Sequence, residues 1–337
     1  MKEVWEGFYR KSSIKVPIIC VNQTGTVETM KRIRVFWPEA HVKPEKMAEL
    51  AIAGHIFLGF ESIRIPFDHL VEVEALGVKI NLGTMREFPE VIRPLDVMLT
   101  QYEFPENFIE RGRLPVVFEA LKELKKRVKS NVPLIVGVMS PFSILTQAFG
   151  LERFLRWIVK DATNIFSKMS EMTTYLIEYG KLLKRYGADI ICLEEIFASM
   201  LSFNFFKRYL VPILRKFITD VNMPVVLHIC GDTKHLLPAI AEIEPAGLSL
   251  DEKTDLNEAK KVLRNIKVIG NISTHLLLQG DENAIKQAVR KAIMNHVDII
   301  APGCSLHPLT PTKNVIAMKK AVSELEYQVN LRETESP

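Results

Sequence analysis

The segment ADIICLEE at residues 188–195 is a nearly continuous apolar run that contains β-branched residues and ends in two acids. Such runs are typical of parallel strands that are covered on both faces. Seven further runs resemble it, and helical patterns separate them: 16–22, 62–67, 134–139, 224–230, 246–251, 266–271 and 297–303. Eight strands that alternate with helices predict a TIM (β/α)8 barrel in the α/β class, with a doubly wound open sheet as the alternative.

The segments between these runs predict helices and two additions to the barrel. Apolar residues recur with helical spacing over 117–128 and 169–183, which predicts helices that pack on the sheet. Residues 28–58 predict a helical N-terminal elaboration. The long insertion after the second strand, 68–131, contains VKINLGT at 78–84, which predicts a small strand outside the barrel.

The composition excludes several classes of protein. The 337 residues include 44 basic and 40 acidic ones, so a net charge of +4 gives no reason to expect a nucleic-acid partner. Four cysteines are too few for a disulfide scaffold and favour a reducing, cytoplasmic location. No apolar run reaches the roughly 18 residues of a membrane span. Because no linker divides the chain, we expect one TIM-barrel domain over 1–330 and a loose C-terminal tail at 331–337.

The predicted strand ends locate the candidate functional residues, because TIM-barrel active sites lie at the carboxyl ends of the strands. Polar and metal-binding residue types gather there: Asn22, Gln23, Arg64, Asp68, Ser140, Glu194, Glu195, His228, Cys230, Asp251, Asn271 and Cys304. His228 and Cys230 are two residues apart in one strand, so their side chains point to the same face.

Cys304 follows the eighth predicted strand and would complete a set of one nitrogen and two sulfurs. Zinc binds imidazole and thiolate ligands, and three protein ligands leave one position open, as in catalytic zinc sites. The alternative is that these cysteines are small core residues. Asp251 ends the sixth predicted strand and is either a fourth, displaceable zinc ligand with a catalytic role or a loop acid that caps a helix or pairs with a cation.

Three long stretches in the second half of the chain carry a family resemblance. They are LHICGDTKHLLPAIAEIEPAGLSLDEKTDL (227–256), VIGNIS (268–273) and DIIAPGCSLHPLTPTKNVIAMKKAV (298–322), and four N-terminal pieces add to them: VNQTGTVETM, FWPEAH, RIPFDHLVEVEALG and RGRLPVVFEAL. The sequence resembles the methylcobamide:coenzyme M methyltransferases of the uroporphyrinogen decarboxylase superfamily. The resemblance implies a TIM barrel and zinc on His228, Cys230 and Cys304. The family's further acidic ligand is a glutamate, whereas Asp251 is one methylene shorter.

The resemblance also implies a reaction. A zinc-bound thiolate of coenzyme M would attack the methyl group of methylcobalamin on cobalt(III) and leave cobalt(I), in C1 metabolism of the methanogenesis type. The D-x-H-x-x-G pattern of corrinoid carriers is absent, so we expect a separate corrinoid protein as partner. Arg64 is a candidate cation for the sulfonate, or else forms a salt bridge with an acid. Gln23 and Asn271 would donate hydrogen bonds to the substrate, or else to loop backbone.

Other functions remain open at this point. Uroporphyrinogen decarboxylation on the same fold uses arginines just after the first strand, and here the first arginine in that region is Arg32. Tetrahydrofolate or another thiol could replace coenzyme M as the methyl acceptor. A zinc-stabilised scaffold that docks corrinoid proteins without catalysis is the non-enzymatic alternative, and it predicts that added thiol does not exchange a zinc ligand.

Overall fold

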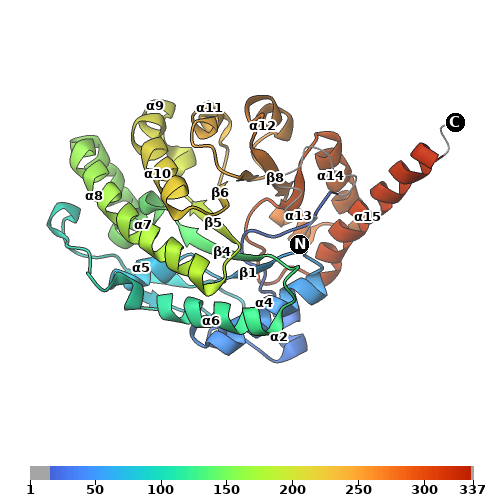
Figure 1. Cartoon of the computed structure of the whole chain (residues 1–337), viewed down its shortest axis with the longest axis horizontal. Coiled ribbons are helices and arrows are strands. Elements are labelled where there is room, and N and C mark those ends of the chain that lie inside the picture. Colours follow the sequence, from blue (N-terminus) through green and yellow to red (C-terminus); the bar gives the residue numbers. More distant parts are fainter. Residues whose placement is uncertain (1–15, 335–337) are drawn as a thin grey trace.

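Seven parallel strands form one curled sheet at the centre of the molecule (Figure 1). The computed structural model describes residues 16–334. Neighbouring strands in the sheet follow one another in the order β1, β4, β5, β6, β7, β8, β9. Their bounds are Ile63–Ile65, Leu134–Met139, Ile190–Glu195, Val225–Ile229, Gly247–Leu250, Lys267–Ile272 and Ile299–Pro302. Each strand corresponds to one of the predicted apolar runs, and most of their residues are buried, as parallel strands covered on both faces require.

The run at 16–22 differs from the prediction, because it does not form a regular strand. Ile18 makes only an isolated parallel bridge to Ile300 of β9, with hydrogen bonds of 2.9–3.0 Å on either side of it. At the opposite edge of the sheet, Glu61 donates its backbone N–H to Ile18 at 2.7 Å, just before β1 begins. Pro17 has no N–H to donate, which limits the ladder. The curled sheet therefore has seven regular strands, one fewer than the eight predicted for a closed barrel.

Helices cover the outer face of the sheet (Figure 1). The predicted N-terminal elaboration is confirmed as helical by α2 (Val27–Ile33), α3 (Glu39–Val42), α4 (Pro44–Ala53) and the π-turn η1 (Gly54–Leu58). The later helices and 3-10 or π turns are α5 (Val71–Ala75), η2 (Leu99–Gln101), η3 (Phe108–Glu110), α6 (Leu114–Arg127), α7 (Pro141–Phe149), α8 (Leu151–Tyr186), η4 (Ala198–Met200), α9 (Phe203–Phe205), η5 (Phe206–Leu210), α10 (Val211–Val221), η6 (Lys234–Leu236), α11 (Leu237–Ala241), α12 (Leu256–Val262), α13 (Thr274–Gln279), α14 (Glu282–Met294) and α15 (Thr312–Thr334).

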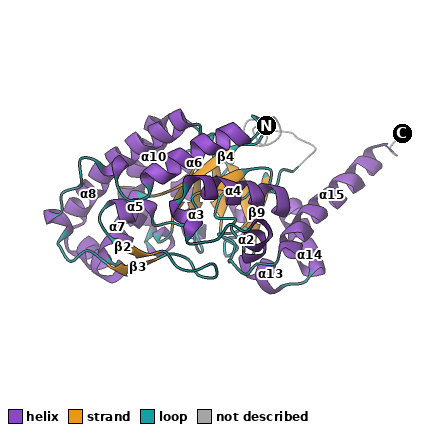
Figure 2. Ribbon diagram, turned by 90° about the horizontal axis from the view of Figure 1, so that it is seen from below, coloured by secondary structure: helices purple, strands orange, loops and turns teal. Residues whose placement is uncertain are grey.

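The insertion after β1 contributes a small hairpin. Its strands β2 (Lys79–Asn81) and β3 (Glu90–Arg93) pair antiparallel and lie apart from the main sheet (Figure 2). The small strand predicted within 78–84 is thus confirmed, and its partner at 90–93 was not predicted. The hairpin matters for function because the turn between its strands and β3 line the site described below.

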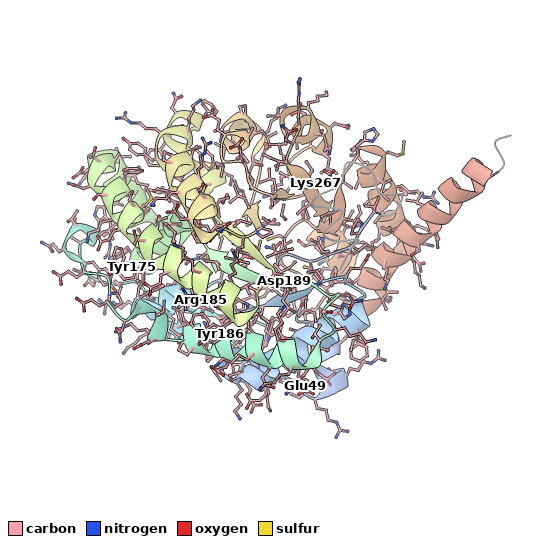
Figure 3. All side chains as sticks on the ribbon, viewed as in Figure 1. Glu49, Tyr175, Arg185, Tyr186, Asp189 and Lys267 are labelled. Atoms are coloured by element: carbon pink, nitrogen blue, oxygen red, sulfur yellow. The ribbon has the colours of Figure 1, made fainter. Side chains whose placement is uncertain are left out.

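The long helices pack on the sheet through the predicted apolar stripes. In α8, the stripe from Met169 to Leu183 is buried, so these methionines are core residues. Gly187, with a φ of +105°, ends α8 in the left-handed conformation that favours glycine. Tyr186, labelled in Figure 3, stacks on Phe118 of α6 with ring centroids 4.8 Å apart. Aromatic packing therefore joins the two helices near the start of β5.

The last helix of the fold extends into the predicted C-terminal tail. Helix α15 continues to Thr334, so residues 331–334 of the predicted tail are helical and 335–337 lie outside the described residues. Within residues 16–334, no helix combines the length and the apolar character that crossing a membrane requires.

Candidate active site

Three predicted ligand residues meet at the carboxyl ends of β6 and β9. His228 Nε2 lies 3.4 Å from the Cys230 sulfur, and the Cys230 and Cys304 sulfurs are 3.8 Å apart. The three ligand atoms all lie within 4.8 Å of one another. Two strands, β7 and β8, separate β6 from β9 in the sheet. Since neighbouring strands are about 4.8 Å apart, a flat sheet would hold these residues roughly 14 Å from one another, and the curl brings them together.

Ser249 of β7 fixes the orientation of His228. The two residues are register partners in neighbouring strands, and His228 Nδ1 lies 3.0 Å from the Ser249 hydroxyl oxygen. If Nδ1 carries the proton and donates to Ser249, Nε2 presents its lone pair to the two sulfurs. The imidazole is almost fully buried, so it is held in this orientation.

The cysteines of the cluster differ from the other two. The hydrogen bond between the two sulfurs lowers the pKa of Cys304 and raises that of Cys230, so one of the pair gives up its proton more readily. By contrast, burial raises the pKa of Cys20 to about 12 and that of Cys192 well above its usual range. The latter two thiols are buried and protonated, and we assign them to the core.

A cavity of about 360 Å³ opens beside the cluster. Both cysteines line it, together with residues from the loop after β1, from the hairpin and from the ends of other strands. The lining residues are Asp68, His69, Leu70, Phe88, Pro89, Glu90, Val91, Gln147, Ile196, Cys230, Cys304 and Ser305. Its size suits a small molecule, and it is concave with a few polar groups on a largely apolar wall, as ligand sites usually are.

A buried network centred on Glu194 lies next to this cavity. Arg64 Nη2 donates to Glu194 Oε1 at 2.8 Å, and Asn22 donates to the same oxygen at 3.2 Å. His69 Nδ1 lies 2.7 Å from Oε2. Burial by itself raises the pKa of Glu194, but Arg64 and His69 outweigh it and lower the pKa to about 2. Glu194 is therefore a permanent buried anion at neutral pH.

Comparison with known proteins identifies the family. The sequence profile of the uroporphyrinogen decarboxylase (URO-D) family matches residues 3–325. The methylcobamide:CoM methyltransferase MtaA of Methanosarcina barkeri is 36% identical over 317 residues, which cover 92% of this chain and 93% of the relative. The chain belongs to the methylcobamide:CoM methyltransferases of the URO-D family.

Other comparisons agree with this family of methyltransferases. The methylcobamide:CoM methyltransferase MtbA of Methanosarcina acetivorans is 29% identical, with 93% of this chain and 94% of the relative covered. A solved methyltransferase structure from Methanosarcina mazei has 33% identity and a TM-score of 0.91, and the match covers 96% of this chain and 98% of that one. The chain is an enzyme of the transferase class.

The other predicted site residues of this methyltransferase are engaged within the protein. Arg64 is 1% exposed and bound to Glu194, so the structure contains the salt bridge that the residue pattern left open. Gln23 donates to the backbone oxygen of Leu306 and accepts from the N–H of Gly25 at 2.6 Å. Asn271 donates to the backbone oxygens of Asp251 and Thr254 at 3.0 and 2.8 Å. Gln23 and Asn271 thus stabilise loops beside the cluster, and Arg64 links β1 to β5.

Asp251 is not one of the three residues whose ligand atoms lie together, and both of its carboxylate oxygens accept backbone N–H groups. Its Oδ2 accepts the N–H of Gly231 at 2.9 Å, and its Oδ1 accepts that of Lys253 at 3.0 Å. In the described residues the group of potential ligands that lie together consists of His228, Cys230 and Cys304. Asp251 thus ties the loop after β7 to the residue that follows Cys230.

Sequence reasoning missed His69. The sequence nevertheless pointed to it, because DHL at 68–70 directly follows the predicted strand at 62–67. A histidine at that point reaches the same end of the sheet as the other candidates. In the methyltransferase it lies between Glu194 and Ser305 and forms part of the cavity wall.

Proposed function

We propose that this enzyme transfers a methyl group from a methylated corrinoid to the thiol of coenzyme M, with zinc held by His228, Cys230 and Cys304. The observation that carries the proposal is a cluster of one imidazole and two thiols that opens on a cavity of small-molecule size. The methylcobamide:CoM methyltransferases among its relatives support the donor and the acceptor.

The geometry of the cluster fits a tetrahedral zinc ion. With Zn–S bonds of about 2.3 Å and Zn–N bonds of about 2.05 Å, tetrahedral angles would separate two sulfurs by about 3.8 Å and a sulfur from a nitrogen by about 3.6 Å. The corresponding distances here are 3.8 Å and 3.4 Å. A bound zinc ion would favour the thiolate form of an added thiol at neutral pH, which is the nucleophilic form.

The residues of the chain supply the remaining requirements. Ser249 holds the His228 imidazole so that its free nitrogen and both sulfurs face one point. Phe88, Val91 and Ile196 form an apolar wall of the cavity, which suits the approach of a methyl group and limits competing water. Both thiols must lose their protons when zinc binds, and the lowered pKa of Cys304 favours this loss at one of them.

The proposal also concerns the methyl donor, the cellular location and the closure of the barrel. We infer a separate corrinoid protein as methyl donor, a cytoplasmic location and a place in C1 metabolism of the methanogenesis type. We also infer that residues 17–19 complete a (β/α)8 barrel within a single domain over residues 1–330, since backbone hydrogen bonds join them to both edges of the sheet.

A direct assay tests the proposed reaction. Purified enzyme is mixed with free methylcobalamin and coenzyme M, and demethylation of the cobalamin is followed optically while zinc is measured by metal analysis. We expect about one zinc per chain and demethylation that depends on both the thiol and the zinc. Tetrahydrofolate and other thiols serve as alternative acceptors. Transfer to tetrahydrofolate but not to coenzyme M would contradict the proposed acceptor, and zinc binding without any transfer would favour the scaffold alternative.

Ser249→Ala is expected to weaken zinc binding without unfolding the protein. Loss of the hydroxyl leaves the buried Nδ1 of His228 without its 3.0 Å partner, so the imidazole is no longer held in one orientation. Removal of such partners typically costs about 10–100-fold in metal affinity. Competition with a chelator measures the change. Ser62→Ala removes another buried serine, whose hydroxyl accepts from Cys20, and should leave zinc affinity unchanged.

Asp251→Ala tests our proposal that this carboxylate is an exchangeable fourth zinc ligand. We expect the variant to keep its zinc, because three ligands remain, and to bind coenzyme M more tightly, because no carboxylate must be displaced. In a zinc-loaded, thiol-free structure of the wild type, an Asp251 oxygen should lie about 2.0–2.2 Å from the metal. Asp232→Ala is the matched control, since Asp232 accepts the nearby N–H of Lys234. A separation far beyond bonding distance, with lower stability of Asp251→Ala, would instead make Asp251 a loop acid.

A further inference from the structure

His69 is positioned between a buried anion and the residue next to a zinc-binding cysteine. Its Nδ1 lies 2.7 Å from Glu194 Oε2, and its Nε2 lies 3.2 Å from the hydroxyl oxygen of Ser305, which follows Cys304. His69, Cys230, Cys304 and Ser305 all line the same cavity. The imidazole side chain is 26% exposed, so solvent can reach it.

The hydrogen bonds of Glu194 determine which nitrogen of His69 carries a proton. Oε1 of Glu194 is occupied by two donors, Arg64 and Asn22. The ionised carboxylate can only accept, so at Oε2 it accepts the Nδ1–H of His69. In neutral His69 the lone pair is then on Nε2, the atom that faces Ser305 and the cavity.

We propose that His69 is the base that takes the proton from the acceptor thiol. This inference rests on the proposed function. The S–H bond of the thiol breaks, its electron pair stays on sulfur, and a new N–H bond forms at Nε2, either directly or through the Ser305 hydroxyl. Glu194 stays ionised and stabilises the imidazolium through Nδ1–H. The proton leaves His69 for solvent only after the thiolate has been methylated, so it stays on the imidazolium while the thiol is bound.

The groups that face His69 favour this role. They are Glu194 from β5, Arg64 from β1 and Cys304 from the loop after β9. Burial lowers the pKa of His69, but the carboxylate of Glu194 raises it by more, and the net pKa lies above the usual value for histidine. A base is most effective when its pKa is close to the working pH.

Other acids and bases at this end of the sheet are less suited. The pKa of Glu194, about 2, makes it too weak a base. Both carboxylate oxygens of Glu195 already accept hydrogen bonds, one from the Ser140 hydroxyl and the other from the Ser143 hydroxyl. Asp68 is bound by Arg113, with contacts of 2.6 and 3.0 Å.

Proton counting with His69→Gln tests the inference without relying on turnover. Coenzyme M binding is measured by calorimetry at about pH 7.5 in buffers of different ionisation enthalpy. In the wild type, His69 keeps the thiol proton, so well under one proton should reach the buffer. In the variant, which cannot accept it, release should approach about one proton per thiol, since a free thiol with a pKa near 8.5 is mostly protonated at this pH. His235→Gln is the control, because His235 contacts the backbone oxygen of Leu201 and does not line the cavity.

The pH dependence of methyl transfer gives a second readout. Because the base must be neutral, the wild-type rate should rise with pH through the raised pKa of His69. His69→Gln should lose this limb, lose about 10²–10⁴-fold in rate at neutral pH, and recover in part when imidazole is added. Zinc content should stay at the wild-type level.

Equal proton release by the wild type and His69→Gln, with no rescue by imidazole, would overturn the assignment of His69. His69→Asn, measured alongside, shows whether any loss comes from the amide that replaces the ring. These outcomes differ from failure of the proposed function, which would appear in the wild type as absent zinc or absent transfer to coenzyme M.

Discussion

Replacing Cys304 with serine should strongly weaken zinc binding and abolish the methyl-transfer activity, whereas the same exchange at Cys20 should change neither. Cys304 supplies one of two sulfurs that lie 3.8 Å apart, the separation that tetrahedral zinc requires. A serine hydroxyl is deprotonated far less readily than a thiol and is a poorer partner for zinc. Structural zinc sites in zinc-finger peptides bind the ion with about 10–16 kcal/mol, and this free energy depends on all of their ligands. Loss of one ligand should therefore weaken zinc binding by at least about 10²–10³-fold.

Metal analysis and the methylcobalamin assay check this prediction together. Cys230→Ser should behave as Cys304→Ser does, because each removes one sulfur from the same cluster. Cys20→Ser is the matched control, since its buried thiol already contacts the backbone oxygen of Asn22 at 3.3 Å and a hydroxyl can keep that hydrogen bond. An unchanged zinc affinity of Cys304→Ser, measured by competition with a chelator, would exclude the cluster as the zinc site.

The sequence was sufficient to predict the strands that carry the site. Seven of the eight predicted runs are strands of the sheet, because an apolar run with β-branched residues can be buried on both faces only in a parallel sheet. The exception, 16–22, begins next to Pro17, and its hydrogen bonds to β9 join it to residues almost 300 positions away. Local patterns cannot report such a long-range pairing.

The cluster of His228, Cys230 and Cys304 was predictable from the sequence for a related reason, and the Glu194 network was not. His228 and Cys230 share a face by local geometry alone, and the strand order places Cys304 at the same end of the sheet. Arg64 and His69 instead reach Glu194 across 130 and 125 residues of sequence, and their pairing depends on how far each side chain extends.

One sign of that network was nevertheless in the sequence. Gly137 interrupts the apolar run of β4, and a glycine inside a strand often marks a close approach. The guanidinium of Arg64 occupies the space where any larger residue at Gly137 would place its Cβ. The glycine therefore makes room for a buried cation, but the sequence does not say which cation fills the space.

Glu194→Gln should destabilise the fold by about 3–5 kcal/mol, because it leaves Arg64 as a buried charge without its anion. Arg64 and Glu194 are each 1% exposed, and their atoms lie 2.8 Å apart. Both oxygens of the Glu194 carboxylate accept hydrogen bonds, Oε1 from Arg64 and Asn22 and Oε2 from His69. The amide of glutamine has one accepting oxygen and one donating nitrogen, so it cannot accept all three hydrogen bonds at these two positions. Thermal unfolding should show a midpoint lower by on the order of 10 °C.

The pH dependence of stability distinguishes this ion pair from a packing effect. The native pKa of Glu194 is about 2, below the ordinary glutamate value of 4.5 that applies to the unfolded chain. A lowered native pKa contributes stability that is complete above about pH 5 and is lost as the pH falls from 4.5 toward 2. The difference between wild type and Glu194→Gln should therefore shrink across that window. A difference that stays constant down to pH 2 would assign the loss to packing instead.

The surface pair between Arg215 and Glu244 provides the matched control for the same substitution. These two side chains also form an arginine–glutamate contact, at 3.1 Å, but they are 57% and 71% exposed. Water already solvates both charges, so Glu244→Gln should cost at most about 1 kcal/mol. If both variants lost equal stability, burial would not be what makes the Glu194 network strong. We expect the loss of stability to be several-fold larger for Glu194→Gln than for Glu244→Gln. Removing the anion at Glu194 leaves the buried cation of Arg64 without a partner, and water cannot reach that cation.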